Sequence, residues 1–294
     1  MGERERPGAA VTRREAIVAG LRAGAGAAVA CSLAPALVAC AGARRPAPTT
    51  APPRLVLSLG AFAAALAREP GPTLDAARAA GAELVELPSP HPPPGSSLAR
   101  LRQALDAAGL VVASARVGTG RLYRGWERTL DAAATLGCQA LTCAAPQPDE
   151  RPTARDWAEL GELFARAGEA AAGARVELRV LVDAAWAASP GVGDPLRLVL
   201  RATEAAAVAF VVDTRGAAAA PDDALVLLRK GGRRVRGVVV DGREGPGAPA
   251  LAAARVVGAE EWIVAVADAD RGGPPFARVR EALVRVGGLR HPSP

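Results

Sequence analysis

Short apolar runs rich in valine and leucine alternate with longer stretches of alanine, leucine and arginine along most of the chain. A short apolar run bounded by turn residues is typical of a buried strand, and an alanine- and leucine-rich stretch of at least ten residues is typical of a helix. The strand-like runs begin at Leu55, Glu83, Leu110, Cys138, Val176, Val208, Val235 and Glu261. Eight such units predict an α/β fold, a single (β/α)₈ TIM barrel with parallel strands.

The length of the chain leaves room for one barrel and an N-terminal segment. The sequence has 294 residues, and this kind of barrel typically needs about 250. We therefore expect a signal segment over residues 1–39, a tether rich in proline, alanine and threonine over 40–54, the barrel over 55–289 and a tail over 290–294. The first barrel helix is the least regular, because Pro70 and Pro72 interrupt it.

The positive charge of the chain does not indicate a nucleic-acid partner. The net charge is +6, but the arginines are spread through every predicted helix and aromatic residues make up only 3% of the sequence. A nucleic-acid-binding surface gathers basic residues on one face. Lys230 is the one lysine, and it lies before the seventh strand, on the face opposite the expected active site. A Schiff-base aldolase is therefore excluded.

The N-terminus has the features of an export signal. Thr12–Val18, with Arg13 and Arg14, resembles the twin-arginine export motif, and an uncharged stretch over Ala23–Ala39 follows. This stretch is too poor in leucine and isoleucine for a transmembrane anchor. We expect export by the twin-arginine route to the periplasm or the cell surface.

Leu37–Cys40 resembles a lipobox, in which Cys40 would become the lipidated first residue of the mature protein. The alternative is cleavage by an ordinary signal peptidase near Ala41–Ala43. With the lipobox, the lipid would be the only membrane contact of a tethered barrel.

Two further cysteines flank the fourth predicted strand. Cys138 and Cys143 are five residues apart, which in extended chain is roughly 16 Å and beyond the reach of a disulfide. We interpret both as small core residues. Too few partners lie nearby in the sequence for a metal site.

Several stretches resemble the sugar phosphate isomerase/epimerase family, the xylose-isomerase-like barrels. They are Ala80–Leu87, Leu98–Leu110, Leu136–Leu141, Val211–Thr214 and Glu261–Val264, and the resemblance extends over residues 55–289. It implies a barrel that isomerises or epimerises a sugar with a divalent metal ion, Mn²⁺ or Mg²⁺, held at the ends of the later strands. Such an ion stabilises the charge that develops on adjacent sugar oxygens.

The resemblance also assigns metal positions, and few of them keep a ligand. Asp213 matches the family's acid after the sixth strand, and Asp183 stands where the fifth strand has histidine or glutamate. Val238 stands where the seventh strand has a histidine three residues before Asp241, and Val266 where the eighth has glutamate. Valine cannot bind a metal. We therefore expect no cofactor, or a divalent ion bound weakly by Asp213 and Asp183.

Other polar residues lie at the predicted strand ends. Glu86 and Asp183 are candidate catalytic carboxylates, and the candidate substrate-binding residues are His91, Arg116, Asp241 and Asp268, with Asp270 beside the last. The alternative is that an aspartate after a strand only starts a turn or caps a helix. His91, among prolines, would then be an ordinary loop residue.

Two functions stay open. One is a metal-dependent sugar isomerase or epimerase; the other is a non-catalytic barrel that binds a carbohydrate or a partner protein at the same face. The substrate depends on loops that no motif defines, and no pattern in the chain indicates an oligomeric state.

Overall fold

The computed structural model describes residues 52–93, 95–144, 153–183, 186, 193–215, 221–243, 249–266 and 275–288. All of them belong to one compact unit of the chain, Pro48–Pro294. The predicted signal segment with Arg13, Arg14 and Cys40, most of the tether, and the C-terminal tail lie outside the described residues. Asp268 and Asp270 also lie outside them.

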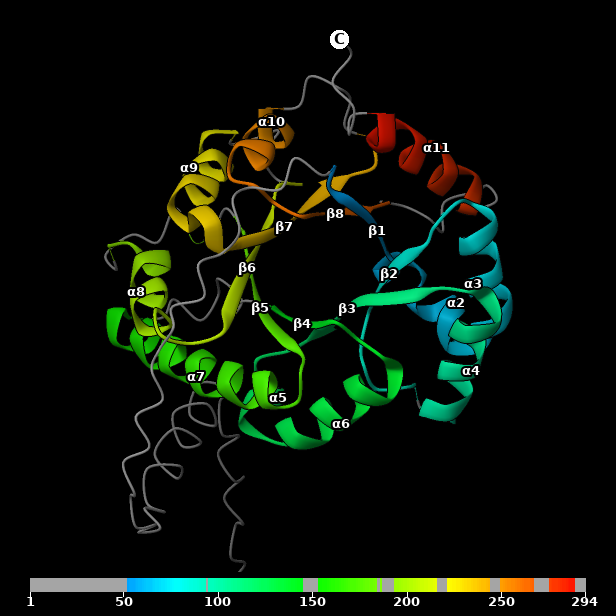
Figure 1. Ribbon diagram of the computed structural model, residues 1–294, viewed down its shortest axis with the longest axis horizontal. Coiled ribbons are helices and arrows are strands. Elements are labelled where there is room, and N and C mark those ends of the chain that lie inside the picture. Colours follow the sequence, from blue (N-terminus) through cyan, green and yellow to red (C-terminus); the bar gives the residue numbers. More distant parts are fainter. Residues whose placement is uncertain are drawn as a thin grey trace, which may run out of the picture. The chain divides into compact units, whose positions relative to one another are not determined.

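Parallel strands close into a barrel in which each strand pairs with its neighbour in sequence and the first pairs with the last (Figure 1). The strands are β1 (Arg54–Ser58), β2 (Leu84–Leu87), β3 (Val111–Val117), β4 (Ala140–Ala144), β5 (Glu177–Val182), β6 (Val208–Asp213), β7 (Val235–Asp241) and β8 (Glu261–Ala265). Each overlaps the apolar run that predicts it. The prediction of a single (β/α)₈ barrel is confirmed.

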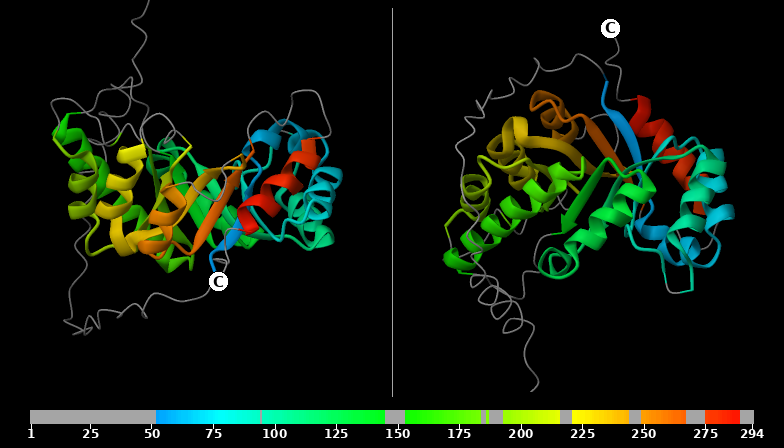
Figure 2. Two further views of the ribbon diagram at one scale, coloured as in Figure 1. Left: turned by 90° about the horizontal axis from the view of Figure 1, so that it is seen from above. Right: turned by 60° about the horizontal axis from the view of Figure 1, so that its bottom comes forward.

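Helices form a layer outside the strands (Figures 1 and 2). They are α2 (Ala63–Arg68), α3 (Pro70–Ala79), α4 (Leu98–Ala108), α5 (Gly120–Tyr123), α6 (Trp126–Leu136), α7 (Ala154–Gly173), α8 (Pro195–Ala202), α9 (Pro221–Gly231), α10 (Pro249–Val256) and α11 (Pro275–Gly288), with the short 3₁₀ turns η2 (Gly60–Phe62) and η5 (Gly232–Arg234). None of the described helices is long and apolar enough to cross a membrane.

Local signals in the sequence set several helix ends. The first helix divides between Arg68 and Pro70, as the prolines predict, because a proline interrupts a helix but fits its first turn. Thr153 caps α7, and its hydroxyl and the Asp156 carboxylate each accept a hydrogen bond from the other's backbone N–H. Gly137 ends α6 in the left-handed conformation that glycine adopts without strain.

Alternate residues along most strands belong to two separate hydrophobic cores. The outer core lies between the sheet and the helices and includes Val85, Val180 and Val240. The inner core lies inside the barrel and comprises Val56, Ala113, Leu181, Val211, Val239, Ile263 and Ala265. Because successive side chains of a strand point to opposite faces, membership of one core tells which way a strand residue points.

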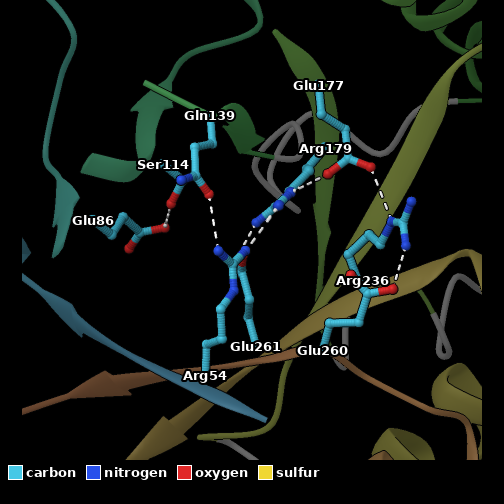
Figure 3. A network of polar contacts seen from close by, with 9 residues as sticks. All are labelled: Arg54, Glu86, Ser114, Gln139, Glu177, Arg179, Arg236, Glu260 and Glu261. Atoms are coloured by element: carbon cyan, nitrogen blue, oxygen red, sulfur yellow. Dashed lines mark hydrogen bonds and ion pairs between the residues drawn. The ribbon is translucent and has the colours of Figure 1, made fainter. Parts of the chain in front are cut away.

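Ion pairs form a layer at the amino ends of the strands, which we call the charged floor (Figure 3). It comprises Arg54, Glu177, Arg179, Arg236, Glu260 and Glu261. Three arginines and three glutamates balance each other within it. The floor lies at the end of the barrel opposite the carboxyl ends of the strands, where active sites of this fold occur.

The centre of the charged floor is buried. Arg179 Nη1 lies 2.5 Å from Glu261 Oε2, and the two side chains are only 5% and 1% exposed. Arg179 Nε also lies 2.7 Å from Glu177 Oε2, and Arg54 donates to Glu261 and to Gln139. These bonds satisfy charges that would otherwise be costly to bury.

Cys138 and Cys143 are buried free thiols in the outer core, as the sequence predicts. Burial raises the pKa of each thiol to about 12. Both therefore stay protonated near neutral pH and are poor nucleophiles or metal ligands.

Candidate functional site

Polar side chains converge at the carboxyl ends of the strands. Glu86 on β2, Arg116 on β3, Asp213 on β6 and Asp241 on β7 lie there. Asp183 follows directly after β5. The structure thus brings most of the sequence-predicted site residues to the mouth of the barrel.

Glu86 is a buried carboxylate whose two oxygens are both occupied. It is 1% exposed; Oε2 accepts from Ser58 Oγ at 2.9 Å and from Arg116 Nε at 2.8 Å, and Oε1 from Ser114 Oγ at 3.4 Å (Figure 3 shows the last). These contacts tie β1, β2 and β3 together. Glu86 is therefore placed to hold Arg116 rather than to meet a substrate itself.

The ends of β6 and β7 carry the same local arrangement. Asp213 accepts from the guanidinium of Arg215 through both oxygens, with the shortest contact at 2.6 Å, and from the Arg215 backbone N–H. Asp241 does the same with Arg243, with the shortest contact at 2.7 Å. Bidentate pairing sets the direction of each guanidinium relative to its carboxylate; the Arg215 side chain is 42% exposed and that of Arg243 is 76% exposed.

The charges at the mouth interact across the barrel. Hydrogen bonds to Asp213 raise the pKa of the Arg215 guanidinium against the effect of burial, and the charges of Asp213, Glu86 and Asp241 raise it further. The hydrogen bond from Arg243 lowers the pKa of Asp241 against the effect of burial, and the charge of Arg215 adds to the lowering. Arg215 is thus electrostatically linked to carboxylates of three strands.

Among the described residues, the paired carboxylates at the mouth do not fit a divalent ion. Each of Glu86, Asp213 and Asp241 already accepts hydrogen bonds from an arginine, and a guanidinium beside a carboxylate repels a metal ion. Within the part of the chain that the structure describes, no three His, Cys, Asp or Glu side chains gather closely enough to hold one.

The two valines assigned to metal positions do not face the site. Val238 and Val266 belong to the outer core, whereas Val239 and Ala265 belong to the inner core. The interpretation that these valines replace inward-facing ligands is therefore wrong. Whether a metal ion fits the site depends instead on the ion pairs that Arg116, Arg215 and Arg243 form with the carboxylates.

His91 lies at the rim and contacts a helix. Its Nε2 is 3.1 Å from Thr129 Oγ1 on α6, and its backbone N–H donates to Ser89 Oγ. Burial lowers the pKa of His91, and the positive charges of Arg121 and Arg128 lower it further. The imidazole is therefore neutral near pH 7, and no contact in the structure links it to Glu86 or Arg116 among the described residues.

Sequence reasoning missed several polar residues of the mouth. Arg215 and Arg243 could have been found from the repeated Asp-x-Arg pattern at the ends of the sixth and seventh apolar runs. Thr142 on β4 also faces the barrel interior, because Leu141 and Cys143 on either side belong to the outer core. Its hydroxyl oxygen is buried and has no hydrogen-bond partner among the residues described.

Neither a family model nor a curated protein matches the chain. Solved structures do. A sugar phosphate isomerase/epimerase from Parabacteroides distasonis superposes with a TM-score of 0.68 at 16% identity, over 82% of this chain and 96% of its own. The chain has the fold of these enzymes.

Two epimerases are similar in the same way. An L-ribulose 3-epimerase has a TM-score of 0.60 at 16% identity, over 81% of this chain and 94% of its own. A D-psicose 3-epimerase, solved in the presence of D-fructose, has a TM-score of 0.57 at 16% identity, over 78% and 89%. The resemblance read from the sequence motifs is confirmed at the level of the fold.

Proposed function

We propose that this protein binds a small carbohydrate at the carboxyl ends of its strands and does so without a divalent metal ion. The observation that carries the proposal is that Glu86, Asp213 and Asp241 are each engaged by an arginine. A metal-dependent isomerase needs such oxygens as ligands. Here they serve as partners that orient guanidinium groups.

A carbohydrate is favoured as the ligand because the structural neighbours are sugar isomerases and epimerases. Arginine–carboxylate pairs suit sugars, since they offer several donors and acceptors in fixed directions to hydroxyl groups. A partner protein at this face has no comparable support.

The same geometry argues against sugar isomerisation. That reaction needs a base within reach of the proton beside a carbonyl group and a group that stabilises the developing oxyanion. Glu86 is buried and both its oxygens accept hydrogen bonds within the protein. Three hydrogen bonds within the protein thus engage this carboxylate, which leaves Glu86 poorly placed to take a proton from a substrate.

Calorimetric titration with Mn²⁺ and Mg²⁺ tests the proposal that the protein works without a divalent metal ion. We expect no binding tighter than micromolar, because an ion would have to displace Arg215 from Asp213. Asp213→Ala should therefore leave the titration unchanged, as should the control Asp106→Ala, which removes an exposed carboxylate paired with Arg102 on α4.

Submicromolar binding that disappears in Asp213→Ala but persists in Asp106→Ala would contradict the proposal. The metal-dependent isomerase would then become the better function, and conversion of D-fructose or D-psicose would be the activity to assay.

We also propose that the barrel is exported and lipid-anchored. The twin arginines Arg13 and Arg14 precede the uncharged stretch Ala23–Ala39, and Cys40 follows that stretch, which is the order such signals require. Metabolic labelling with a palmitate analogue should label the wild type and the control Cys31→Ala, but not Cys40→Ala. Equal labelling of the Cys40→Ala protein would refute the lipid anchor.

A further inference from the structure

A polar corner lies inside the barrel between β3 and β4. Arg116 and Thr142 are register partners on these adjacent strands, and both face the interior. On its other side Thr142 is in register with Arg179 of β5, whose guanidinium is already engaged by Glu177 and Glu261. Side chains that are directly opposite each other on one face of a sheet are neighbours. The guanidinium and the hydroxyl therefore occupy the same corner.

Most of the donors in this corner have no partner among the described residues. Arg116 donates through Nε to Glu86, and its two terminal nitrogens make no hydrogen bond with any described residue. The Thr142 side chain is 1% exposed and its hydroxyl lacks a partner within the same part of the chain. A buried polar group without a hydrogen-bond partner is uncommon in folded proteins, so we expect a bound ligand to supply the partner.

Glu86 makes this corner rigid. The Glu86 carboxylate accepts a hydrogen bond from Arg116 Nε, and the hydroxyl groups of Ser58 and Ser114 donate to the same carboxylate. Residues from three strands thus hold the guanidinium before any ligand arrives. Such preorganisation lowers the entropic cost of binding.

From these observations we propose that Arg116 and Thr142 form a subsite for a carboxylate group of the bound carbohydrate, so that the ligand is a sugar acid. The inference rests on the proposed carbohydrate-binding function and adds the class of ligand. Guanidinium nitrogens only donate, and a threonine hydroxyl can donate as well. A carboxylate only accepts, so it matches the corner better than a neutral sugar hydroxyl.

Repulsion from Glu86 favours a monoanion over a phosphate. Glu86, Asp213 and Asp241 are matched by Arg116, Arg215 and Arg243, so these pairs sum to zero. A carboxylate adds one negative charge close to Glu86, and a phosphate ester adds nearly two. The second charge would raise the repulsion from Glu86.

Calorimetric titration of the full chain with D-gluconate, D-glucose and D-glucose 6-phosphate tests the inference. We expect D-gluconate to bind most tightly. Arg116→Gln should weaken its binding about tenfold or more, since a charge-assisted pair is lost, and Thr142→Val by several-fold. Thr142→Ser, which keeps the hydroxyl, should bind like the wild type.

Stability measurements separate a binding role from a structural one. Thr142→Val removes an unpartnered buried hydroxyl, so its unfolding midpoint should be unchanged or higher while gluconate affinity falls. Matched controls are Arg100→Gln on α4 and Thr135→Val on α6, whose side chains lie on exposed helix positions. Neither control should alter gluconate binding.

The outcomes distinguish this inference from the proposed function. Gluconate binding that is unaffected by Thr142→Val and Arg116→Gln overturns the subsite, as does tighter binding of D-glucose or D-glucose 6-phosphate. In those cases carbohydrate binding itself still stands. If none of the three compounds binds the wild type, both the subsite and the carbohydrate-binding proposal fail.

Discussion

Replacing Glu261 with alanine should lower the free energy of unfolding by about 3–5 kcal/mol. The substitution removes the main partner of Arg179, whose side chain is 5% exposed at the centre of the charged floor. Arg179 would keep only the Glu177 contact. A buried charge that loses its partner carries the cost of its lost hydration uncompensated.

Glu260 provides a matched control one residue away. It pairs with Arg236 in the same floor, but its side chain is 45% exposed. Exposed ion pairs contribute about 1 kcal/mol or less, so Glu260→Ala should have a small effect. Denaturant unfolding of the two variants beside the wild type measures the difference.

A double substitution separates the net contribution of the Arg179–Glu261 ion pair from the cost of leaving Arg179 buried without its partner. Arg179→Met combined with Glu261→Leu removes both charges and keeps apolar volume, so it should recover most of the stability lost in Glu261→Ala. If Glu260→Ala and Glu261→Ala destabilise the protein equally, burial of the Arg179–Glu261 pair is not what gives the floor its importance.

The fold could be predicted from the sequence because its signal is distributed over the whole chain. Every strand, from β1 (Arg54–Ser58) to β8 (Glu261–Ala265), overlaps a predicted apolar run. If one apolar run had been assigned wrongly, the number of alternating strand and helix units would still have indicated a barrel. The position of Glu86, Asp213 and Asp241 at the mouth followed from the same pattern, since each ends or nearly ends a strand.

The direction of individual side chains was less predictable. Val238 lies three residues before Asp241, and residues an odd number apart on a regular strand point to opposite faces. Asp241 faces the mouth, so Val238 faces the helices. Val266 and Ala265 are likewise an odd number of residues apart, and they belong to the outer and the inner core respectively. Attention to strand parity would have removed both valines from the candidate metal site.

The ion pairs at the mouth could not be predicted from spacing alone. Arg116 on β3 reaches Glu86 on the neighbouring strand β2, and the two residues are 30 positions apart in sequence. A long flexible side chain has many rotamers, and tertiary neighbours select among them. The local pairs Asp213–Arg215 and Asp241–Arg243 were accessible in principle, because an aspartate readily bonds the backbone two residues on.

Gly161→Ala should lower the free energy of unfolding by about 1–3 kcal/mol, the usual cost of an overpacked core. Gly161 is a buried residue of α7 that faces α8. A methyl group there would lie 2.6 Å from Ala202 Cβ and 3.3 Å from Val199 Cα. Neither atom belongs to a flexible side chain, so the two helices would have to move apart. This cost exceeds the gain of roughly 0.5–1 kcal/mol that alanine brings to a helix interior.

Gly173, the last residue of α7, is the matched control for Gly161. A methyl group added at Gly173 meets no atom within 4 Å. Gly173→Ala should therefore leave the free energy of unfolding unchanged or raise it by up to about 1 kcal/mol, because only helix propensity and the unfolded chain are affected. Thermal and denaturant unfolding of both variants compare the two sites in one helix. Equal effects would mean that α7 and α8 have room to separate, and that the close approach at Gly161 does not limit the packing of the barrel.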